Sequence, residues 1–262
     1  MSVQAKSNRL NIRNLLAMKG KERVAMLTAY DVMTAHCLDR AGVEVLLVGD
    51  SLGNVVYGFE STLPVTMDMT LAHSGAVVRG SERAFVVADL PFMSYQTSLE
   101  EGVRNAGLCL AQAGAQGVKL EGASEYIQLL VKRLVETGIP VMGHIGLTPQ
   151  SVHQMGGFYK HGKNATSAER LKQEARALAS AGCFSIVLEC VEENVAREIS
   201  AEVPCLTIGI GSGRVCDGEV LVVNDVLGYT LGKAPSFAEK LANLSEVVED
   251  AARKYVDGVK RS

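Results

Sequence analysis

Short apolar runs alternate with amphipathic stretches along most of the chain. Eight runs rich in Val, Ile and Leu occupy Val24–Tyr30, Val45–Asp50, Phe85–Leu90, Gly117–Gly122, Pro140–Gly146, Ser185–Cys190, Cys205–Gly211 and Glu219–Asp225. Most of them are nearly continuous rather than alternating in polarity, which is typical of parallel strands buried on both faces of a sheet. The pattern therefore predicts a buried parallel sheet.

Amphipathic helical patterns lie between several of these runs. The clearest are Glu101–Ala113, Ser124–Thr137 and Ser167–Ala181. In the last of them we expect Ser167 to be the N-cap, because its hydroxyl can accept from the free amides of a first turn. Gly182 suits the C-cap, because glycine readily adopts the left-handed conformation that ends many helices.

The order of strands and helices predicts the architecture. Strands that alternate with helices pair in parallel, and eight of them suggest closure into a barrel. We expect an α/β fold, a single (β/α)8 TIM-type barrel with parallel strands. One catalytic domain should span residues 1–262, with an N-terminal helical segment at roughly 1–22, because no Pro- or Ser-rich linker divides the chain. An open doubly wound sheet is the alternative.

Charged side chains stand at or near the carboxyl ends of the second to sixth runs. They are Asp50, Asp89, Lys119, Glu121, His144 and Glu189. The carboxyl ends of barrel strands meet at one mouth, where active sites lie. Asp50 or Asp89 alone could cap a turn, and Lys119 could simply pair with Glu121. Taken alone, His144 is most simply a hydrogen-bonded core histidine. The occurrence of all these groups at successive strand ends favours an active site.

The carboxylates indicate which cation such a site would bind. Three carboxylates without a His or Cys cluster favour a hard cation with oxygen ligands. Magnesium commonly takes one or two protein carboxylates and keeps water or substrate oxygens as its other ligands. Asp50 and Asp89 are the candidate ligands, with Glu121 as a third carboxylate nearby.

Composition limits the partners. The chain has 262 residues, a net charge of −3 and no basic block, so neither nucleic acid nor a membrane surface is an expected partner. No apolar run reaches the roughly 18 residues that a spanning helix needs. The N-terminus lacks the apolar core of a secretory signal, and the six cysteines form no CxxC motif. We therefore expect a cytoplasmic enzyme that acts on small molecules.

A glycine-rich segment, Gly209–Gly213, superficially resembles a dinucleotide-binding loop. Arg214, however, stands where the third glycine of that fingerprint belongs. Glycine here more simply allows close backbone approach at the barrel mouth, or forms an anion site after the seventh strand.

From about Thr28 to about Leu227, the chain closely resembles the ketopantoate hydroxymethyltransferase family. The matching segments, in unbroken order, are Thr28–Asp31, Val48–Gly53, Ser61–Thr66, Ala88–Tyr95, Val118–Gly122, Gly143–Val152, Leu188–Val191, Ile208–Gly211 and Asp217-Gly218. The chain departs from the family pattern after Gly156-Gly157, where an aromatic and a basic residue normally precede Val-Gln-Gly. Here the segment is Phe158–Gly162, with His161 before the glycine.

The resemblance implies a reaction and its cofactors. Members of the family transfer a hydroxymethyl group from 5,10-methylenetetrahydrofolate to 3-methyl-2-oxobutanoate and form 2-dehydropantoate and tetrahydrofolate. This is a step of pantothenate and coenzyme A biosynthesis that depends on Mg²⁺. The resemblance also implies a homodecamer. A metal-dependent lyase or mutase of similar fold and a catalytically silent barrel are the alternatives.

The resemblance also implies roles for individual residues. Asp50 and Asp89 would bind Mg²⁺, and through this ion they would bind the substrate. Glu121 would lie close to the metal. Ser51 and Lys119 would hold the substrate carboxylate, and His144 would lie in the substrate pocket. Glu189 would be the catalytic base.

Overall fold

The computed structural model describes residues 9–157 and 159–261. By their internal contacts, residues 1–220 and 221–262 form two compact units. The predicted N-terminal helical segment, roughly 1–22, falls partly outside the described residues. Within the described part, α1 covers Ile12–Leu16.

The first unit contains a closed barrel of parallel strands in chain order. The strands are β1 (Val24–Thr28), β2 (Val45–Val48), β3 (Phe85–Asp89), β4 (Gly117–Lys119), β5 (Val141–Gly146), β6 (Ser185–Glu189), β7 (Leu206–Ile210) and β8 (Gly218–Leu221). The expected (β/α)8 barrel is confirmed, and the alternative of an open sheet is wrong.

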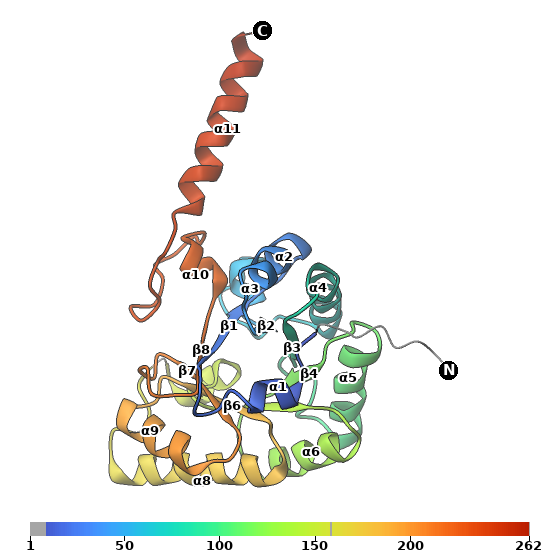
Figure 1. The fold of residues 1–262 in the computed structure, drawn as a ribbon, viewed down its shortest axis with the longest axis vertical. Coiled ribbons are helices and arrows are strands. Elements are labelled where there is room, and N and C mark those ends of the chain that lie inside the picture. Colours follow the sequence, from blue (N-terminus) through green and yellow to red (C-terminus); the bar gives the residue numbers. More distant parts are fainter. Residues whose placement is uncertain (1–8, 158, 262) are drawn as a thin grey trace. The chain divides into compact units, whose positions relative to one another are not determined.

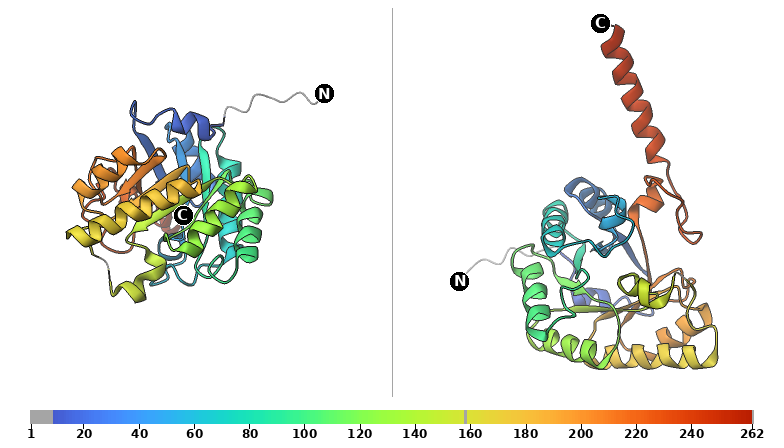
Figure 2. Two further views of the ribbon diagram at one scale, coloured as in Figure 1. Left: turned by 90° about the horizontal axis from the view of Figure 1, so that it is seen from below. Right: turned by 180° about the vertical axis from the view of Figure 1, so that it is seen from behind.

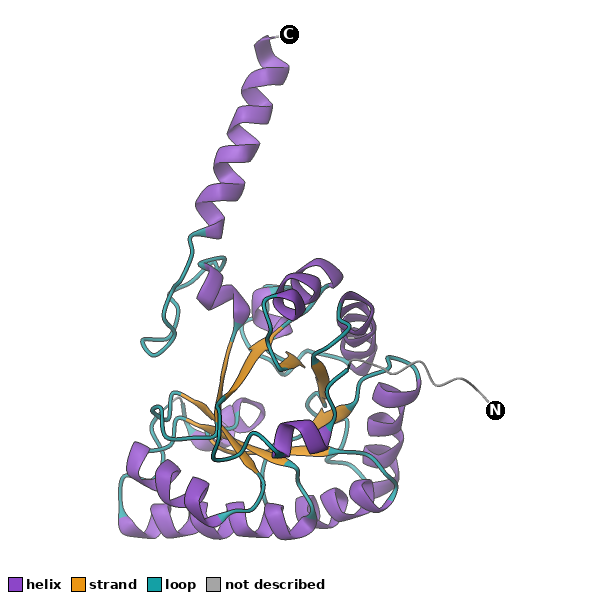
Figure 3. Cartoon of the chain, viewed as in Figure 1, coloured by secondary structure: helices purple, strands orange, loops and turns teal. Residues whose placement is uncertain are grey.

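Helices surround the strands, as Figures 1 and 3 show. The long ones are α2 (Val32–Arg40), α4 (Met67–Gly80), α5 (Leu99–Ala111), α6 (Glu125–Glu136), α8 (Ala165–Ala181) and α9 (Glu193–Glu202). Shorter pieces follow two of the strands: α3 (Leu52–Val55) after β2, then η1 (Pro149–Ser151) and α7 (Val152–Met155) after β5. The two further views in Figure 2 show the same outer ring.

Two apolar clusters hold this barrel together. One joins the outer faces of the strands to the helices, for example through Val118, Leu130 and Leu178. The other fills the barrel interior and includes Met26 and Phe85. Leu15 of α1 belongs to this interior cluster and is fully buried. Because most strand residues are buried on either face, their sequences are continuously apolar.

Two local predictions were wrong. The predicted eighth strand ran to Asp225, but Val223–Leu227 forms the helix α10, which ends at the left-handed Gly228. Asn164, not Ser167, is the N-cap of α8, because its side chain accepts from the amide of Ser167. The predicted C-cap Gly182 is confirmed, with a φ of 106°.

The second unit, described by itself, contains α10 and the long helix α11 (Leu244–Arg261). None of the residues of α11 is buried. Across the described parts of both units, no helix is long and apolar enough to cross a membrane.

Candidate active site

The predicted polar residues meet at one end of the barrel. Asp50 follows β2, Asp89 and Lys119 end β3 and β4 as a register pair, and Glu121 lies just beyond β4. In all of these the side chain is almost completely buried. His144 of β5 is buried as well, whereas the side chain of Glu189, which ends β6, is 16% exposed. Glu189 is therefore the carboxylate of this group that solvent reaches most easily.

Lys119 is the cation at the centre of the site. Its Nζ lies 2.8 and 2.7 Å from the two carboxylate oxygens of Asp89 and 3.8 Å from Glu121. The amide of Asp50 donates to Asp89 at 3.3 Å. Asp89 is thus engaged by Lys119 instead of capping a turn, and the ion pair considered between Lys119 and Glu121 is the looser of the two.

Burial and mutual repulsion disturb the carboxylates. Burial, followed by the charges of Asp89 and Glu121, raises the pKa of Asp50 to about 7. Burial also raises the pKa of Asp89, against the lowering effect of Lys119. Burial alone would lower the pKa of Lys119, but the surrounding carboxylates outweigh it and raise that pKa above its ordinary value. The site therefore has more negative than positive charge to accommodate.

His144 lies between two carboxylates. Its Nδ1 is 3.4 Å from Glu121 and its Nε2 is 3.3 Å from Glu189. Neither contact is aligned as a hydrogen bond. Burial and Lys119 lower the pKa of His144, but these two carboxylates outweigh them and raise it to about 9. The imidazole is therefore a second cation of the site at neutral pH.

Gln150 of η1 is a site residue that sequence reasoning did not single out. Its side-chain amide donates to Asp50 and to the carbonyl of Leu90, both at 3.0 Å. Its backbone amide donates to Glu121 at 3.1 Å. The hydroxyl of Tyr95 in turn donates to the Gln150 side chain at 2.9 Å and accepts from the amide of Glu121. The available signal was the position of Gln150 just after β5.

Ser51 lies at the edge of the same group. Its hydroxyl is 2.9 Å from the hydroxyl of Tyr30, and it makes no capping hydrogen bond to α3. The structure thus brings together at this mouth the residues that the pattern of strand ends indicated, which are Asp50, Asp89, Lys119, Glu121, His144 and Glu189.

The donor chemistry of the site fits a divalent cation. Among the described residues, no group of three or more His, Cys, Asp or Glu side chains is already arranged as a metal site. Asp50 and Asp89 are nevertheless neighbouring oxygen donors, and burial, followed by repulsion from nearby carboxylates, raises the pKa of each. One oxygen of Glu121 is buried without a hydrogen bond to the described residues. An added cation with oxygen preference would relieve this repulsion.

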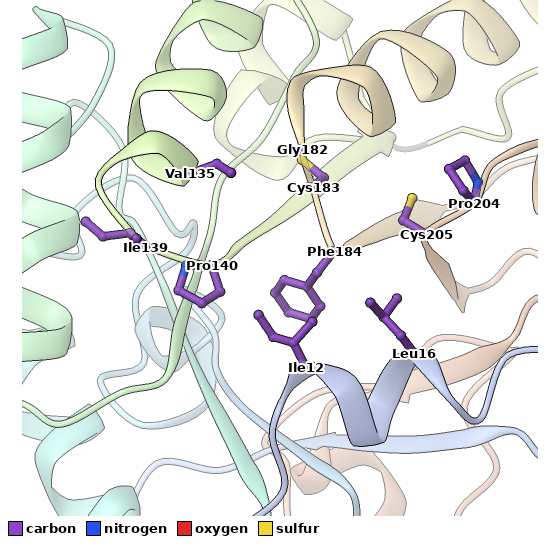
Figure 4. Close-up of a pocket in the computed structure, with 11 residues that line it drawn as sticks. Ile12, Leu16, Val135, Ile139, Pro140, Gly182, Cys183, Phe184, Pro204 and Cys205 are labelled. Atoms are coloured by element: carbon purple, nitrogen blue, oxygen red, sulfur yellow. The ribbon is translucent and has the colours of Figure 1, made fainter.

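A cavity of about 420 Å³ lies at the opposite end of the same strands. Its walls precede β5, β6 and β7 and include Pro140, Phe184 and Cys205, with Ile12 and Leu16 of α1 across from them (Figure 4). Apolar side chains dominate this lining, and burial raises the pKa of the Cys205 thiol to about 11. The cavity lacks the acid and base groups of the mouth.

Comparison with known proteins identifies the family. A model of the family described as ketopantoate hydroxymethyltransferase matches residues 9–262. The chain belongs to this family. It is 53% identical over 261 residues to the 3-methyl-2-oxobutanoate hydroxymethyltransferase of Syntrophus aciditrophicus, covering 99% of this chain and 96% of the relative. The enzyme of that name from Thermotoga maritima is also 53% identical, over 252 residues, with 96% and 93% covered.

Solved structures show the same fold at low identity. A phosphoenolpyruvate phosphomutase from Streptomyces platensis superposes with a TM-score of 0.65 at 13% identity, covering 95% of this chain and 86% of that one. At this level of identity the likeness shows a shared barrel fold alone.

Proposed function

We propose that this protein transfers a hydroxymethyl group from 5,10-methylenetetrahydrofolate to 3-methyl-2-oxobutanoate, giving 2-dehydropantoate and tetrahydrofolate in pantothenate and coenzyme A biosynthesis. The observation that carries the proposal is the buried charged group at the barrel mouth, in a chain whose relatives at 53% identity bear the name of this activity. A site with both a buried cation and an accessible carboxylate suits proton abstraction beside a ketone.

Substrate binding falls to Lys119 and Ser51. A 2-oxo acid brings a carboxylate into a site whose buried cation, Lys119, can neutralise it. Ser51 offers a hydroxyl that can donate to the same carboxylate while it accepts from Tyr30. His144, buried behind Glu189, borders the substrate pocket.

The proposed metal ligands are Asp50 and Asp89, with Glu121 near the ion. Bound Mg²⁺ supplies Lewis-acid polarisation of the substrate ketone, an effect that is worth several kcal/mol. The side-chain amide of Gln150 donates to one oxygen of the Asp50 carboxylate and so holds this carboxylate in place.

Glu189 is the proposed base. Its carboxylate takes the proton from C3 of 3-methyl-2-oxobutanoate, and the electrons of the broken C–H bond move to the keto oxygen. The Nε2 atom of His144 lies 3.3 Å from this carboxylate. A positioned base of this kind contributes roughly 10²–10⁴-fold to the rate. The new carbon nucleophile then attacks the methylene carbon of the folate as one C–N bond of that carbon breaks. Water hydrolyses the remaining C–N bond of the adduct, which gives the hydroxymethyl product and tetrahydrofolate.

One assay tests the reaction. The consumption of 3-methyl-2-oxobutanoate is measured with and without 5,10-methylenetetrahydrofolate, in magnesium buffer and in excess chelator. We expect turnover only with both the folate and the metal. A lyase or mutase of the same fold would act without folate, so folate-independent product formation would overturn the proposal.

A second assay tests the base. Without folate, the parent should exchange the C3 hydrogen of the substrate with D₂O, which collapses the methyl doublet in the NMR spectrum. Glu189→Gln keeps the size and polarity of the side chain but cannot take the proton, so exchange should cease while substrate still binds. Full exchange in this variant would move the role of base to another group.

The setting of the enzyme belongs to the same proposal. The cysteines Cys37, Cys109, Cys183, Cys190, Cys205 and Cys216 are all free thiols. Free thiols suit the reducing cytoplasm in which we place the enzyme. We also propose the homodecamer that the family resemblance implies.

A further inference from the structure

The backbone around Glu189 has an unusual conformation. Cys190, the next residue, has a φ of 50° and is one of only two non-glycine residues with positive φ in the described chain, the other being Met93. A left-handed conformation is unfavourable for a side chain such as cysteine, and it persists only when neighbouring groups hold it. The turn that aims Glu189 into the mouth must therefore be fixed by its surroundings.

One side chain closes this turn. The hydroxyl of Ser212 accepts from the amide of Val191 at 2.9 Å and donates to the carbonyl of Leu188 at 2.8 Å. These two groups lie on either side of the Glu189–Cys190 pair, so a single hydroxyl links the chain before the base to the chain after it. Ser212 is only 1% exposed, so water cannot replace the lost partner if the hydroxyl is removed.

The glycine-rich segment after β7 brings this hydroxyl into place. Gly211 and Gly213, on either side of Ser212, have φ values of 64° and 79°. Two left-handed residues turn the loop so that Ser212 faces β6. The segment that resembled a dinucleotide loop therefore serves close backbone approach at the barrel mouth.

Backbone hydrogen bonds complete the arrangement but cannot be varied by side-chain substitution. The amide of Cys190 donates to Ile210, the carbonyl of Cys190 accepts from His161, and the carbonyl of Glu189 accepts from Leu147. Ser212 is different, because its side chain hydrogen-bonds to the backbone on both sides of the turn. A single substitution can therefore remove both of these bonds.

We infer that Ser212 is a positioning residue for the reaction, which holds the Glu189 carboxylate at the C3 hydrogen of the substrate by clamping the turn between Leu188 and Val191. The inference rests on the proposed role of Glu189 as base. The hydrogen bonds of the Ser212 hydroxyl all go to backbone groups of β6, β7 and the residue Val191, and not to the proposed metal and substrate ligands. Removal of the Ser212 hydroxyl should therefore affect proton transfer and leave substrate binding largely unchanged.

Ser212→Ala tests the inference by C3 hydrogen exchange in D₂O, with Mg²⁺ and without folate. A displacement of about 1 Å in a reacting group can cost on the order of 10²-fold, so we expect exchange to slow by at least tenfold. The dissociation constant for 3-methyl-2-oxobutanoate should stay within about threefold of the parent value, because ground-state binding does not use this turn. Ser212→Thr, which retains a hydroxyl, should recover part of the exchange rate.

Ser185→Ala is the matched control. Ser185 begins the same strand, β6, at its far end, is 1% exposed, and its hydroxyl has no hydrogen-bond partner among the described residues. The Ser185→Ala variant should exchange the C3 hydrogen of the substrate at nearly the parent rate. Exchange in Ser212→Ala within twofold of the parent, or equal losses of exchange and substrate binding, would overturn the inference. Equal loss of exchange in the Ala and Thr variants would also overturn it.

The parent enzyme and Glu189→Gln separate this inference from the function on which it rests. A parent that does not exchange contradicts the proposed function, and a Gln variant that does exchange contradicts the proposed role of Glu189 as base. If Glu189→Gln loses exchange while Ser212→Ala exchanges at the parent rate, only the role of Ser212 is contradicted.

Discussion

At the scale of single residues, the mouth of the barrel holds more buried carboxylates than cations. Asp50, Asp89 and Glu121 are buried within reach of one lysine, and His144 is the other nearby cation. Burial, followed by repulsion between these carboxylates, raises the pKa of Asp50 to about 7, which gives the site a measurable proton.

Binding of Mg²⁺ should therefore release a proton from Asp50. The pKa is raised above the ordinary 3.8, so the neutral acid persists up to about pH 7 and a bound cation displaces its proton. We expect about 0.5 proton released per ion at pH 7, more at pH 6 and little at pH 8.5. Calorimetry in two buffers of different ionisation enthalpy measures this number. An Asp50→Asn variant that binds the ion and releases as many protons would contradict the assignment.

Lys119 should also be important for the stability of the metal-free protein. Lys119→Met leaves Asp89, which is 2% exposed, without its cation, and breaking such a buried pair costs roughly 3–5 kcal/mol of unfolding free energy. Urea denaturation without metal measures the loss, and added Mg²⁺ should reverse part of it. Lys172→Met, in a solvent-exposed pair with Glu198, is the control and should change stability little. Equal stability of the two variants would exclude this role of Lys119.

Sequence reasoning found the ionisable residues of the site but not the amide that organises them. Asp50, Asp89 and Glu189 could be found because charge interrupts or ends an apolar run. Gln150 gave no such signal, since its hydrogen bond to Asp50 joins residues 100 positions apart and depends on the barrel closing. Ser212 is similar, because its partners lie on the neighbouring strand and just beyond it.

At the scale of elements, the starts of most strands could be predicted more closely than their ends, β5 and β7 being the exceptions. The fourth apolar run extended from Gly117 to Gly122, yet β4 ends at Lys119. Beyond that residue the chain stays buried through Glu121, and the amides of Leu120 and Gly122 still donate to carbonyls of β5, so burial and hydrogen bonding continue past the end of the strand. The eighth run misled for a related reason: β-branched residues favour a strand, but a short helix forms from Val223 onward.

A further prediction concerns the close approach of the end of β5 to the end of β6. Gly146 has a φ of 95°, and a Cβ there would lie 2.2 Å from the carbonyl oxygen of Glu189. Gly146→Ala should therefore lower the unfolding free energy by roughly 2–5 kcal/mol, through backbone strain and overpacking together. It should also slow catalysis, because relief of the clash moves the backbone of the base.

Gly138→Ala is the control for that experiment. Gly138 has a similar φ of 86°, but no described atom lies within 4 Å of the position that its Cβ would take, so only strain of about 1–2 kcal/mol remains. Denaturation and initial rates measured on both variants separate strain from contact. Equal losses in the two variants would show that the clash with Glu189 is relieved without cost.

At the scale of the whole molecule, the amphipathic helix α11 bears on assembly. Its apolar residues recur at helical spacing and include Val247, Val248 and Tyr255, which are 62%, 44% and 74% exposed. Arg253 lies on the opposite, charged face and pairs with Asp250. An apolar stripe of this kind is usually buried against a partner, so we expect α11 to lie in contacts between copies of the proposed homodecamer.

Val247→Glu combined with Tyr255→Glu should therefore reduce the size of the assembly. Each substitution places a carboxylate on the apolar stripe, where burial at an interface would be costly without a partner. Light scattering coupled to size-exclusion chromatography measures the mass, and circular dichroism checks that the barrel stays folded. Arg253→Gln combined with Lys260→Gln is the control, since it changes the net charge by the same amount on the polar face. We expect the control to retain the parent mass. If the glutamate variant retained it as well, α11 would lie outside the contacts that build the oligomer, and its apolar stripe would need another explanation.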